Sequence, residues 1–198
     1  MPDSDFKRKC SREDFGWHTR GYIPHFDGGP ELPQFITFRL ADSMPRTVVE
    51  RWIKEKLSDI EFRKRIEHYL DAGAGECWLG QVAVAEIVKN ALLHYDGERY
   101  QLVAWVIMPN HVHLLLIPSP GVHLPEILHS IKSYSAQKAN EFLGRTGAFW
   151  QRESFDRYIR NERHFRNVIK YIEENPVKAR LCKTPGEWAF GSAYNGTD

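Results

Sequence analysis

The sequence predicts an α+β fold: a ferredoxin-like (RRM-like) antiparallel sheet with helices on one face, plus a C-terminal helix that carries a tyrosine. The first observation is the segment 34–41, QFITFRLA, in which β-branched and aromatic residues alternate as they do in a strand. The second is a pair of apolar segments, 100–108 and 111–117, which only a Pro-Asn turn separates. The third is the order of the elements, because strand, helices, two adjacent strands, helix, strand and helix describe a split βαβ layer.

The length of 198 residues fits one domain with terminal extensions. Residues 1–32 are rich in charge, glycine and aromatic side chains, and we expect them to form an irregular basic and aromatic arm. Residues 33–183 make up the predicted domain, and residues 184–198 form a C-terminal tail.

Helical segments separate the first predicted strand from the central strand pair. Apolar residues recur three and four positions apart over 48–70, which predicts one helix after the stop at Pro45. Glycines punctuate residues 71–80, and residues 81–95 show the same helical spacing. We therefore expect two helices between the first strand and the strand pair.

The second half of the domain contains two further predicted helices. Residues 124–143 have helical spacing, and residues 149–161 are expected to be extended or irregular. A final helix is predicted from Glu162 to Asn175, where Pro176 ends it because proline lacks a backbone N–H.

Composition narrows the range of functions. The formal net charge is +1, yet residues 152–183 carry nine Lys and Arg against five Asp and Glu. No apolar segment reaches the roughly 20 residues that span a bilayer, and the N-terminus carries charge where a signal peptide needs apolar residues. The three cysteines are far apart, which favours reduced thiols without a role. We expect a cytoplasmic protein without a membrane partner.

The most informative short segment is MPNHVHLLLIP, residues 108–118. Side chains alternate along a strand, so His111 and His113 point to the same side, about 7 Å apart along the chain. Two such imidazoles can converge on one metal ion. A single histidine is more often a satisfied core or surface residue, so the pair predicts a metal site only if further ligands exist.

The last predicted helix offers a candidate ligand. Tyr171 and Asn175 are four residues apart and therefore share one helix face. If this helix packs against the histidine-bearing strand, the Asn175 amide oxygen could bind the ion while Tyr171 presents its hydroxyl beside it. The alternative is a tyrosine at the rim of an amphipathic helix and an asparagine that caps the helix end.

Three motifs together, MPNHVHLLL, FWQRESFDRYIR and YIEENPVKARL, resemble the HUH tyrosine transposases, specifically the REP-associated tyrosine transposases of the IS200-like family. The resemblance covers about 34–181. It implies that His111 and His113 hold a divalent ion, that Asn175 completes the metal site, and that Tyr171 is the nucleophile. It also implies a single-stranded DNA substrate with a REP-like hairpin, cleaved through a 5′-phosphotyrosine intermediate.

The implied chemistry suits these residues. Phosphodiester cleavage needs an attacking oxygen in line with the leaving oxygen and a nearby group that neutralises the negative charge on the phosphate. Nitrogen and amide ligands allow Mg²⁺ or Mn²⁺ to serve, although imidazoles bind other transition metals more tightly. Tyr134 and Tyr158 are rival nucleophiles, but neither is followed four positions later by an amide ligand.

Binding of a single strand or a hairpin needs a cationic groove and aromatic side chains for stacking. The candidates for contact with DNA are Lys7, Arg8, Lys9, Arg12, Lys132, Arg152, Arg157, Arg160, Arg163 and Arg166. Phe149 and Trp150 could stack on bases, although aromatic residues in this position more often belong to the core.

Two other functions remain open at this point. A domesticated relative could bind a DNA hairpin in a sequence-specific way without turnover. An RRM-like RNA-binding module would share the architecture, but it should expose aromatic residues on its central strands, where this chain has His111 and His113. The resemblance is compatible with a monomer or a homodimer and with a location at the nucleoid.

Overall fold

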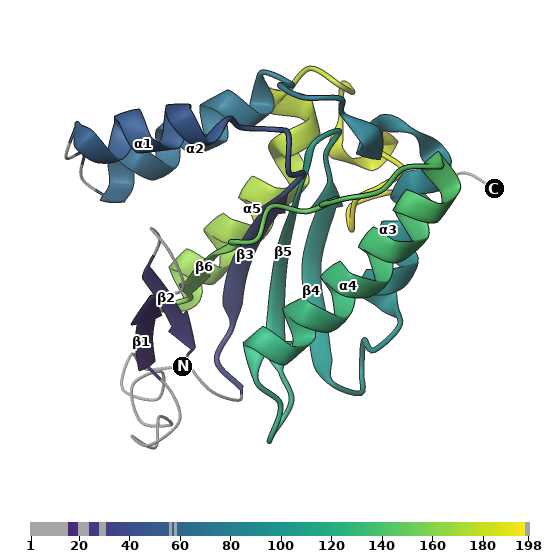
Figure 1. The fold of residues 1–198 in the computed structure, drawn as a ribbon. Coiled ribbons are helices and arrows are strands. Elements are labelled where there is room, and N and C mark those ends of the chain that lie inside the picture. The colour runs from purple at the N-terminus through teal and green to yellow at the C-terminus, as the bar shows by residue number, and fades with distance from the viewer. Residues whose placement is uncertain (1–15, 20–23, 28–30, 56, 58, 197–198) are drawn as a thin grey trace.

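A four-stranded antiparallel sheet organises the chain in the computed structural model, which describes residues 16–19, 24–27, 31–55, 57 and 59–196 (Figure 1). The strands are β3 (Gln34–Arg39), β4 (Tyr100–Ile107), β5 (His111–Pro118) and β6 (Phe155–Tyr158). Their order in the sheet is β4-β5-β3-β6, and each neighbouring pair is antiparallel. The predicted antiparallel sheet is therefore confirmed.

Helices occupy most of the chain between the strands. They are α1 (Arg46–Lys54), α2 (Asp59–Asp71), α3 (Val82–Leu93), α4 (Leu124–Leu143) and α5 (Glu162–Lys178), with short 3-10 segments η1 (Trp78–Gly80) and η2 (Pro185–Glu187). No helix in the described part of the chain is both long enough and apolar enough to cross a membrane.

The single helix predicted over 48–70 is wrong, because the chain reverses between α1 and α2. Reversal lets the Trp52 ring meet the Phe62 ring edge-on at 6.4 Å and the Tyr69 ring at 5.9 Å. These side chains form a small apolar cluster that one straight helix could not make. The two helices lie side by side at one end of the sheet and project beyond it (Figure 1).

Two further expectations need correction. The helix α5 does not end before Pro176 but continues to Lys178. Proline removes only one helical hydrogen bond here, and the Ala179 N–H still donates to the Asn175 carbonyl at 3.0 Å. The N-terminal arm is not irregular throughout, because β1 (Gly16–Thr19) and β2 (Pro24–Asp27) form an antiparallel pair.

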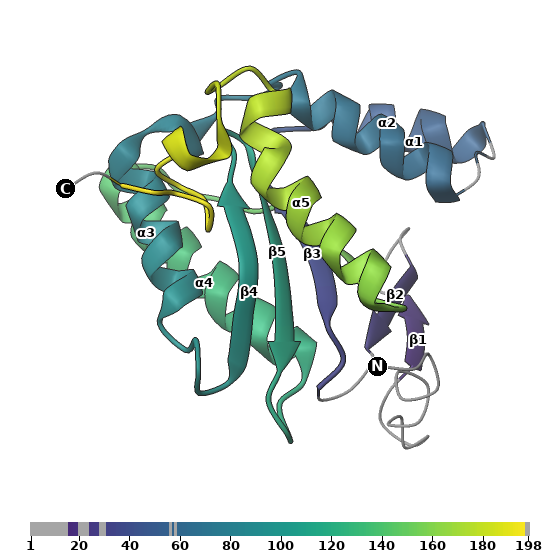
Figure 2. The same cartoon turned by 180° about the vertical axis from the view of Figure 1, so that it is seen from behind.

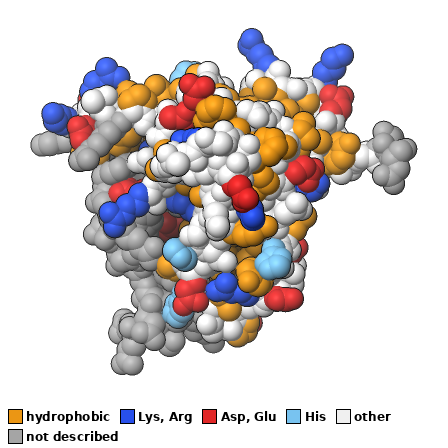
Figure 3. Space-filling model, turned by 45° about the vertical axis from the view of Figure 1, so that its right-hand side comes forward, with side chains coloured by type: hydrophobic (Ala, Val, Ile, Leu, Met, Phe, Trp, Pro, Cys, Tyr) orange, Lys and Arg blue, Asp and Glu red, His pale blue; other side chains and the backbone are white. Residues whose placement is uncertain are grey.

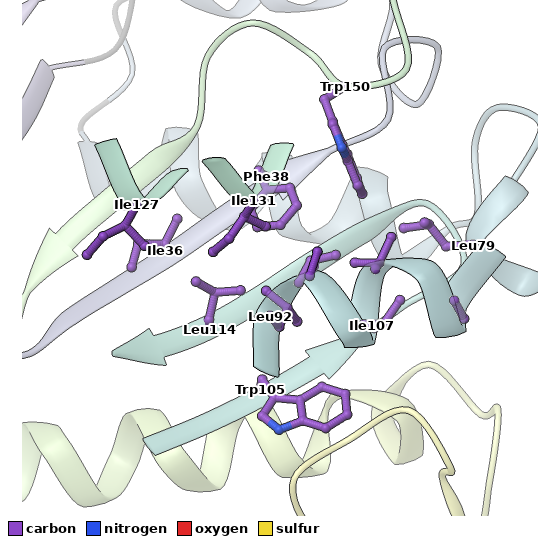
Figure 4. Packing of buried hydrophobic residues seen from close by; sticks show 14 of the residues in the cluster. Ile36, Phe38, Leu79, Leu92, Trp105, Ile107, Leu114, Ile127, Ile131 and Trp150 are labelled. Carbon is purple, nitrogen blue, oxygen red and sulfur yellow. The ribbon is translucent and has the colours of Figure 1, made fainter. Parts of the chain in front are cut away.

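The two faces of the sheet bury different sets of residues. On one face Ile36, Phe38 and Leu114 belong to the main core, which α3 and α4 cover (Figure 4). On the other face Phe35 and Leu115 pack with apolar residues of α5, which crosses this face in Figure 2. Because side chains alternate along β5, the histidines point to the face that α5 covers.

Candidate active site

The two histidines of β5 face each other inside the protein. His111 and His113 are each 1% exposed, and their Nε2 atoms are 3.1 Å apart. In the sheet register His111 lies opposite Arg39 and His113 lies opposite Thr37. Burial lowers the pKa of both imidazoles, to about 3 for His111, where the charge of Arg39 adds to the effect. Both rings are therefore neutral at physiological pH.

Asn110 sets the tautomer of His111. An amide oxygen can only accept, so the contact of 2.7 Å between Asn110 Oδ1 and His111 Nδ1 places the proton on Nδ1. The Nε2 atom of His111 then carries a lone pair directed at His113. The Asn110 amide group also donates to the carbonyls of Leu70 and Ala74, at 3.0 and 2.9 Å. One buried side chain thus joins the histidine pair to the C-terminal end of α2.

Thr37 gives His113 two alternative protonation patterns. Its hydroxyl lies 2.7 Å from His113 Nδ1. If the hydroxyl donates, His113 carries its proton on Nε2 and donates to His111. If the hydroxyl accepts, both Nε2 atoms present lone pairs to each other, an arrangement that only a bound cation stabilises. The second pattern is the one that a metal site uses.

Tyr171 of α5 lies directly against the histidine pair. Its ring is 5.3 Å from the His113 ring and 5.8 Å from the Phe35 ring, between centroids. The Lys178 ammonium is 5.1 Å from the Tyr171 ring centroid. The Tyr171 hydroxyl oxygen is buried and has no hydrogen-bond partner within the described residues.

Carboxylates of α2 influence the same hydroxyl. Burial is the largest cause that raises the pKa of Tyr171 above its usual value, followed by the negative charges of Glu67 and Asp71. Contact with the Asn175 amide opposes this effect. In this arrangement the phenol keeps its proton, and the two carboxylates would repel an approaching phosphate group.

Asn175 completes the group of buried polar residues. It is 1% exposed, and its Oδ1 atom has no hydrogen-bond partner among the residues that the structure describes. A buried acceptor without a donor is costly, so a ligand or ion at this oxygen would stabilise it. No group of three His, Cys, Asp or Glu that could hold a metal is found in the described ranges. Imidazole nitrogens and amide oxygens are ligand types that divalent ions accept, so His111, His113 and Asn175 could hold one.

Among the side chains predicted to contact DNA, Lys132 forms hydrogen bonds within the protein. The Lys132 ammonium donates to the Gln151 carbonyl, the Arg152 carbonyl and Ser154 Oγ, at 2.8, 3.0 and 3.1 Å. Burial, with the charge of Arg39, lowers the pKa of Lys132 to about 8. This lysine therefore fixes the segment 151–154 to α4.

Most of the arginines that are predicted to contact DNA are exposed to solvent. Arg152, Arg160, Arg163 and Arg166 are exposed and Arg157 is half-buried, with Arg166 paired to Glu162. On the face in Figure 3, basic side chains are scattered among acidic and apolar ones. Lys7, Arg8, Lys9 and Arg12 lie outside the described residues.

Other predicted residues have clear positions. Phe149 and Trp150 are core residues, 2% and 6% exposed, which agrees with the structural alternative for them. Among the rival tyrosines, Tyr134 is 52% exposed on α4 and Tyr158 lies on β6. Cys77 and Cys182 are free thiols. Thr37 and Asn110 were missed, because only the strand register and the α2 contact reveal their roles.

We expect Asn110→Ala to destabilise the protein by about 1–3 kcal/mol, because two backbone carbonyls and one imidazole N–H lose their partner. Urea unfolding followed by circular dichroism measures this loss. Gln137→Ala, at an exposed position of α4, is the control and should leave the free energy of unfolding within about 0.5 kcal/mol of wild type. An unchanged midpoint in Asn110→Ala would contradict the described hydrogen bonds.

Comparisons with known proteins show which sequences this chain is similar to. Residues 80–175 match the family model described as "Transposase IS200 like". A REP-associated tyrosine transposase of Escherichia coli (strain K12) is 26% identical over 112 residues, which cover 55% of this chain and 64% of that protein. A relative from Haemophilus influenzae is 25% identical over 116 residues, which cover 54% of this chain and 64% of that protein. The chain thus spans less than two thirds of the length of these curated relatives.

A solved structure shows the same fold. It is a REP-associated tyrosine transposase bound to a REP hairpin, with a TM-score of 0.53 and 19% sequence identity. The match covers 88% of this chain and 81% of that one. It extends the similarity from the segment 80–175 to most of the fold.

Proposed function

We propose that this chain, which is similar to REP-associated tyrosine transposases, cleaves and rejoins single-stranded DNA at or near REP-type hairpins through a 5′-phosphotyrosine intermediate. The observation that carries the proposal is the contact between the Tyr171 ring and the facing pair His111 and His113. These groups come from α5 and β5, which are far apart in the sequence. The strand order β4-β5-β3-β6 supports the ferredoxin-like interpretation of the fold.

The residues have distinct roles in this reaction. Tyr171 loses its proton, its oxygen forms a bond to phosphorus, and the bond from phosphorus to the 3′ oxygen breaks. The departing oxygen takes a proton and leaves a free 3′-hydroxyl, which can later attack the phosphotyrosine and rejoin the strand. His111, His113 and Asn175 would hold Mg²⁺ or Mn²⁺, which supplies positive charge for the phosphate. Asn110 and Thr37 hold the two imidazoles in place.

A second candidate function is hairpin binding without turnover. The burial of the Tyr171 hydroxyl oxygen favours it, because a phosphate group cannot reach this oxygen without a movement of the surrounding side chains. The RNA-binding alternative is less well supported. RRM modules stack bases on one face of the sheet, and in this chain α5 covers the face that carries the histidines.

One experiment distinguishes the two candidate functions. The purified protein is incubated with fluorescently labelled single-stranded hairpins from its own genome and Mn²⁺, and the products are separated on a denaturing gel. We expect a slowly migrating, protease-sensitive band that EDTA prevents. A shifted band on a native gel without any covalent product would instead support the binding protein.

Removal of one α2 carboxylate should increase the rate of the proposed cleavage reaction. We expect Glu67→Gln to raise the rate of covalent product formation several-fold, because it removes a negative charge beside Tyr171 that repels the phosphate. The gel assay at limiting DNA measures the rate, and Glu61→Gln on the same helix is the matched control. A strongly reduced rate in Glu67→Gln would show that this carboxylate takes part in the chemistry.

A further inference from the structure

A cavity of about 500 Å³ lies on the opposite side of the sheet from the histidines, between α4 and the segment 147–156. The sheet register gives this placement, because Asp156 lines the cavity and pairs with Ile36 of the main core. A volume of this size is typical of sites for small organic ligands or single nucleotides. No residue of the candidate active site lines the cavity.

The walls combine apolar surface with buried acids. Leu128, Ala136 and Trp150 contribute apolar surface to the lining. Glu153 and Asp156 also line the cavity, and they are only 8% and 7% exposed. Lys132, Arg152 and His129 also line the cavity, but the Lys132 ammonium is held by the segment 151–154, and Arg152 and His129 are exposed. The buried charged groups that remain are the two carboxylates, which accept hydrogen bonds and so favour a flat apolar ligand with N–H groups at its edge.

The floor of the cavity is held rigidly in place. The Lys132 ammonium binds two carbonyls and one hydroxyl of the segment 151–154, as described above. The indole N–H of Trp150 donates to Ser135 Oγ at 3.0 Å, and this oxygen donates in turn to the Ile131 carbonyl at 2.6 Å. These bonds fix the segment to α4, so the cavity is largely pre-formed.

The cavity is also close to the active site along the backbone. The Gln151 N–H donates to the Arg39 carbonyl at 2.8 Å, and Arg39 lies opposite His111 in the sheet. One strand residue therefore links the cavity wall to the histidine pair. A DNA strand that passes around this end of β3 could contact both.

We propose that this cavity binds one unpaired nucleobase with an exocyclic amino group, belonging to the DNA strand that the active site engages. This inference rests on the proposed function. Cytosine and adenine carry such amino groups, which can donate to Glu153 or Asp156, and their rings can pack on the apolar wall. Uracil and thymine offer a keto oxygen at that position, which a carboxylate disfavours.

The test uses two single-stranded oligonucleotides, dC10 with ten deoxycytidines and dU10 with ten deoxyuridines. Their bases differ in the exocyclic group and in the protonation of the neighbouring ring nitrogen. Fluorescence anisotropy of labelled oligonucleotides gives the two affinities for the full-length protein. We expect dC10 to bind about tenfold more tightly than dU10. Ala136→Trp fills the cavity and should remove this preference while it leaves dU10 binding unchanged. Ser133→Trp, which narrows the same cavity from an exposed position, should act in the same direction.

Gln137→Trp is the matched control, because this exposed residue follows Ala136 on α4 and does not line the cavity. It should keep the preference for dC10. Equal affinities of the wild type for both oligonucleotides would overturn the inference, and so would a preference that survives both cavity variants.

The covalent-band assay separates this inference from the proposed function. Ala136→Trp should still form the covalent product with a genomic hairpin at saturating DNA. If the wild-type protein prefers dC10 but forms no covalent product, the inference about the nucleobase cavity stands and the proposed reaction is rejected.

Discussion

Tyr171→Phe is expected to abolish the covalent protein–DNA band and to reduce cleavage by a factor on the order of 10⁴ or more, as loss of a catalytic nucleophile does. The substitution removes only the hydroxyl oxygen. The phenyl ring keeps its contacts with Phe35 and His113, at 5.8 and 5.3 Å in the wild type, so the fold should persist. Circular dichroism and hairpin binding on a native gel should both match the wild type. The denaturing gel with Mn²⁺ then isolates the chemical step.

The rival tyrosines supply matched controls for this experiment. Tyr134→Phe changes an exposed side chain on α4, and Tyr158→Phe changes the last residue of β6. Both variants should form the covalent band at the rate of the wild type. Cleavage that persists in Tyr171→Phe and disappears in one of the other two would assign the nucleophile to that tyrosine and contradict our assignment.

His111→Ala and His113→Ala are expected to lower Mn²⁺ affinity at least about 100-fold, because each removes one of two facing imidazole nitrogens. Electron paramagnetic resonance of free Mn²⁺ measures this affinity without any catalytic assay. Metal-dependent cleavage should fall by about 10²–10⁴-fold in the same variants. Hairpin binding in EDTA should change much less, since the histidines face the interior and not the DNA surface.

Controls for the histidine variants must account for stability. Each substitution leaves a small cavity in the interior, so urea unfolding should be measured for every variant. His94→Ala, on the opposite side of the sheet, is the matched histidine control and should bind Mn²⁺ as the wild type does. Wild-type Mn²⁺ affinity in both His111→Ala and His113→Ala would remove the metal site from the proposal.

Much of the fold was predictable from local sequence patterns. Alternation over 34–41 and the short turn at Pro109-Asn110 predicted β3 and the antiparallel pair of β4 and β5, which the structure confirms. Helical spacing predicted α4 with its observed bounds, and it predicted α3 and α5 with errors of a few residues at their ends. The α1–α2 reversal was missed, because it depends on contacts between Trp52, Phe62 and Tyr69 that become visible only when the two helices pack.

The candidate site divides in the same way. The sequence by itself determined that His111 and His113 share one side of a strand and that Tyr171 and Asn175 share one side of a helix, because both periodicities are properties of the local backbone. Only the tertiary structure decided that these two surfaces meet, that Asn110 links His111 to α2, and that the Tyr171 hydroxyl is enclosed. Such contacts join residues from separate segments, and their distances depend on how helices pack on the sheet, which no local pattern encodes.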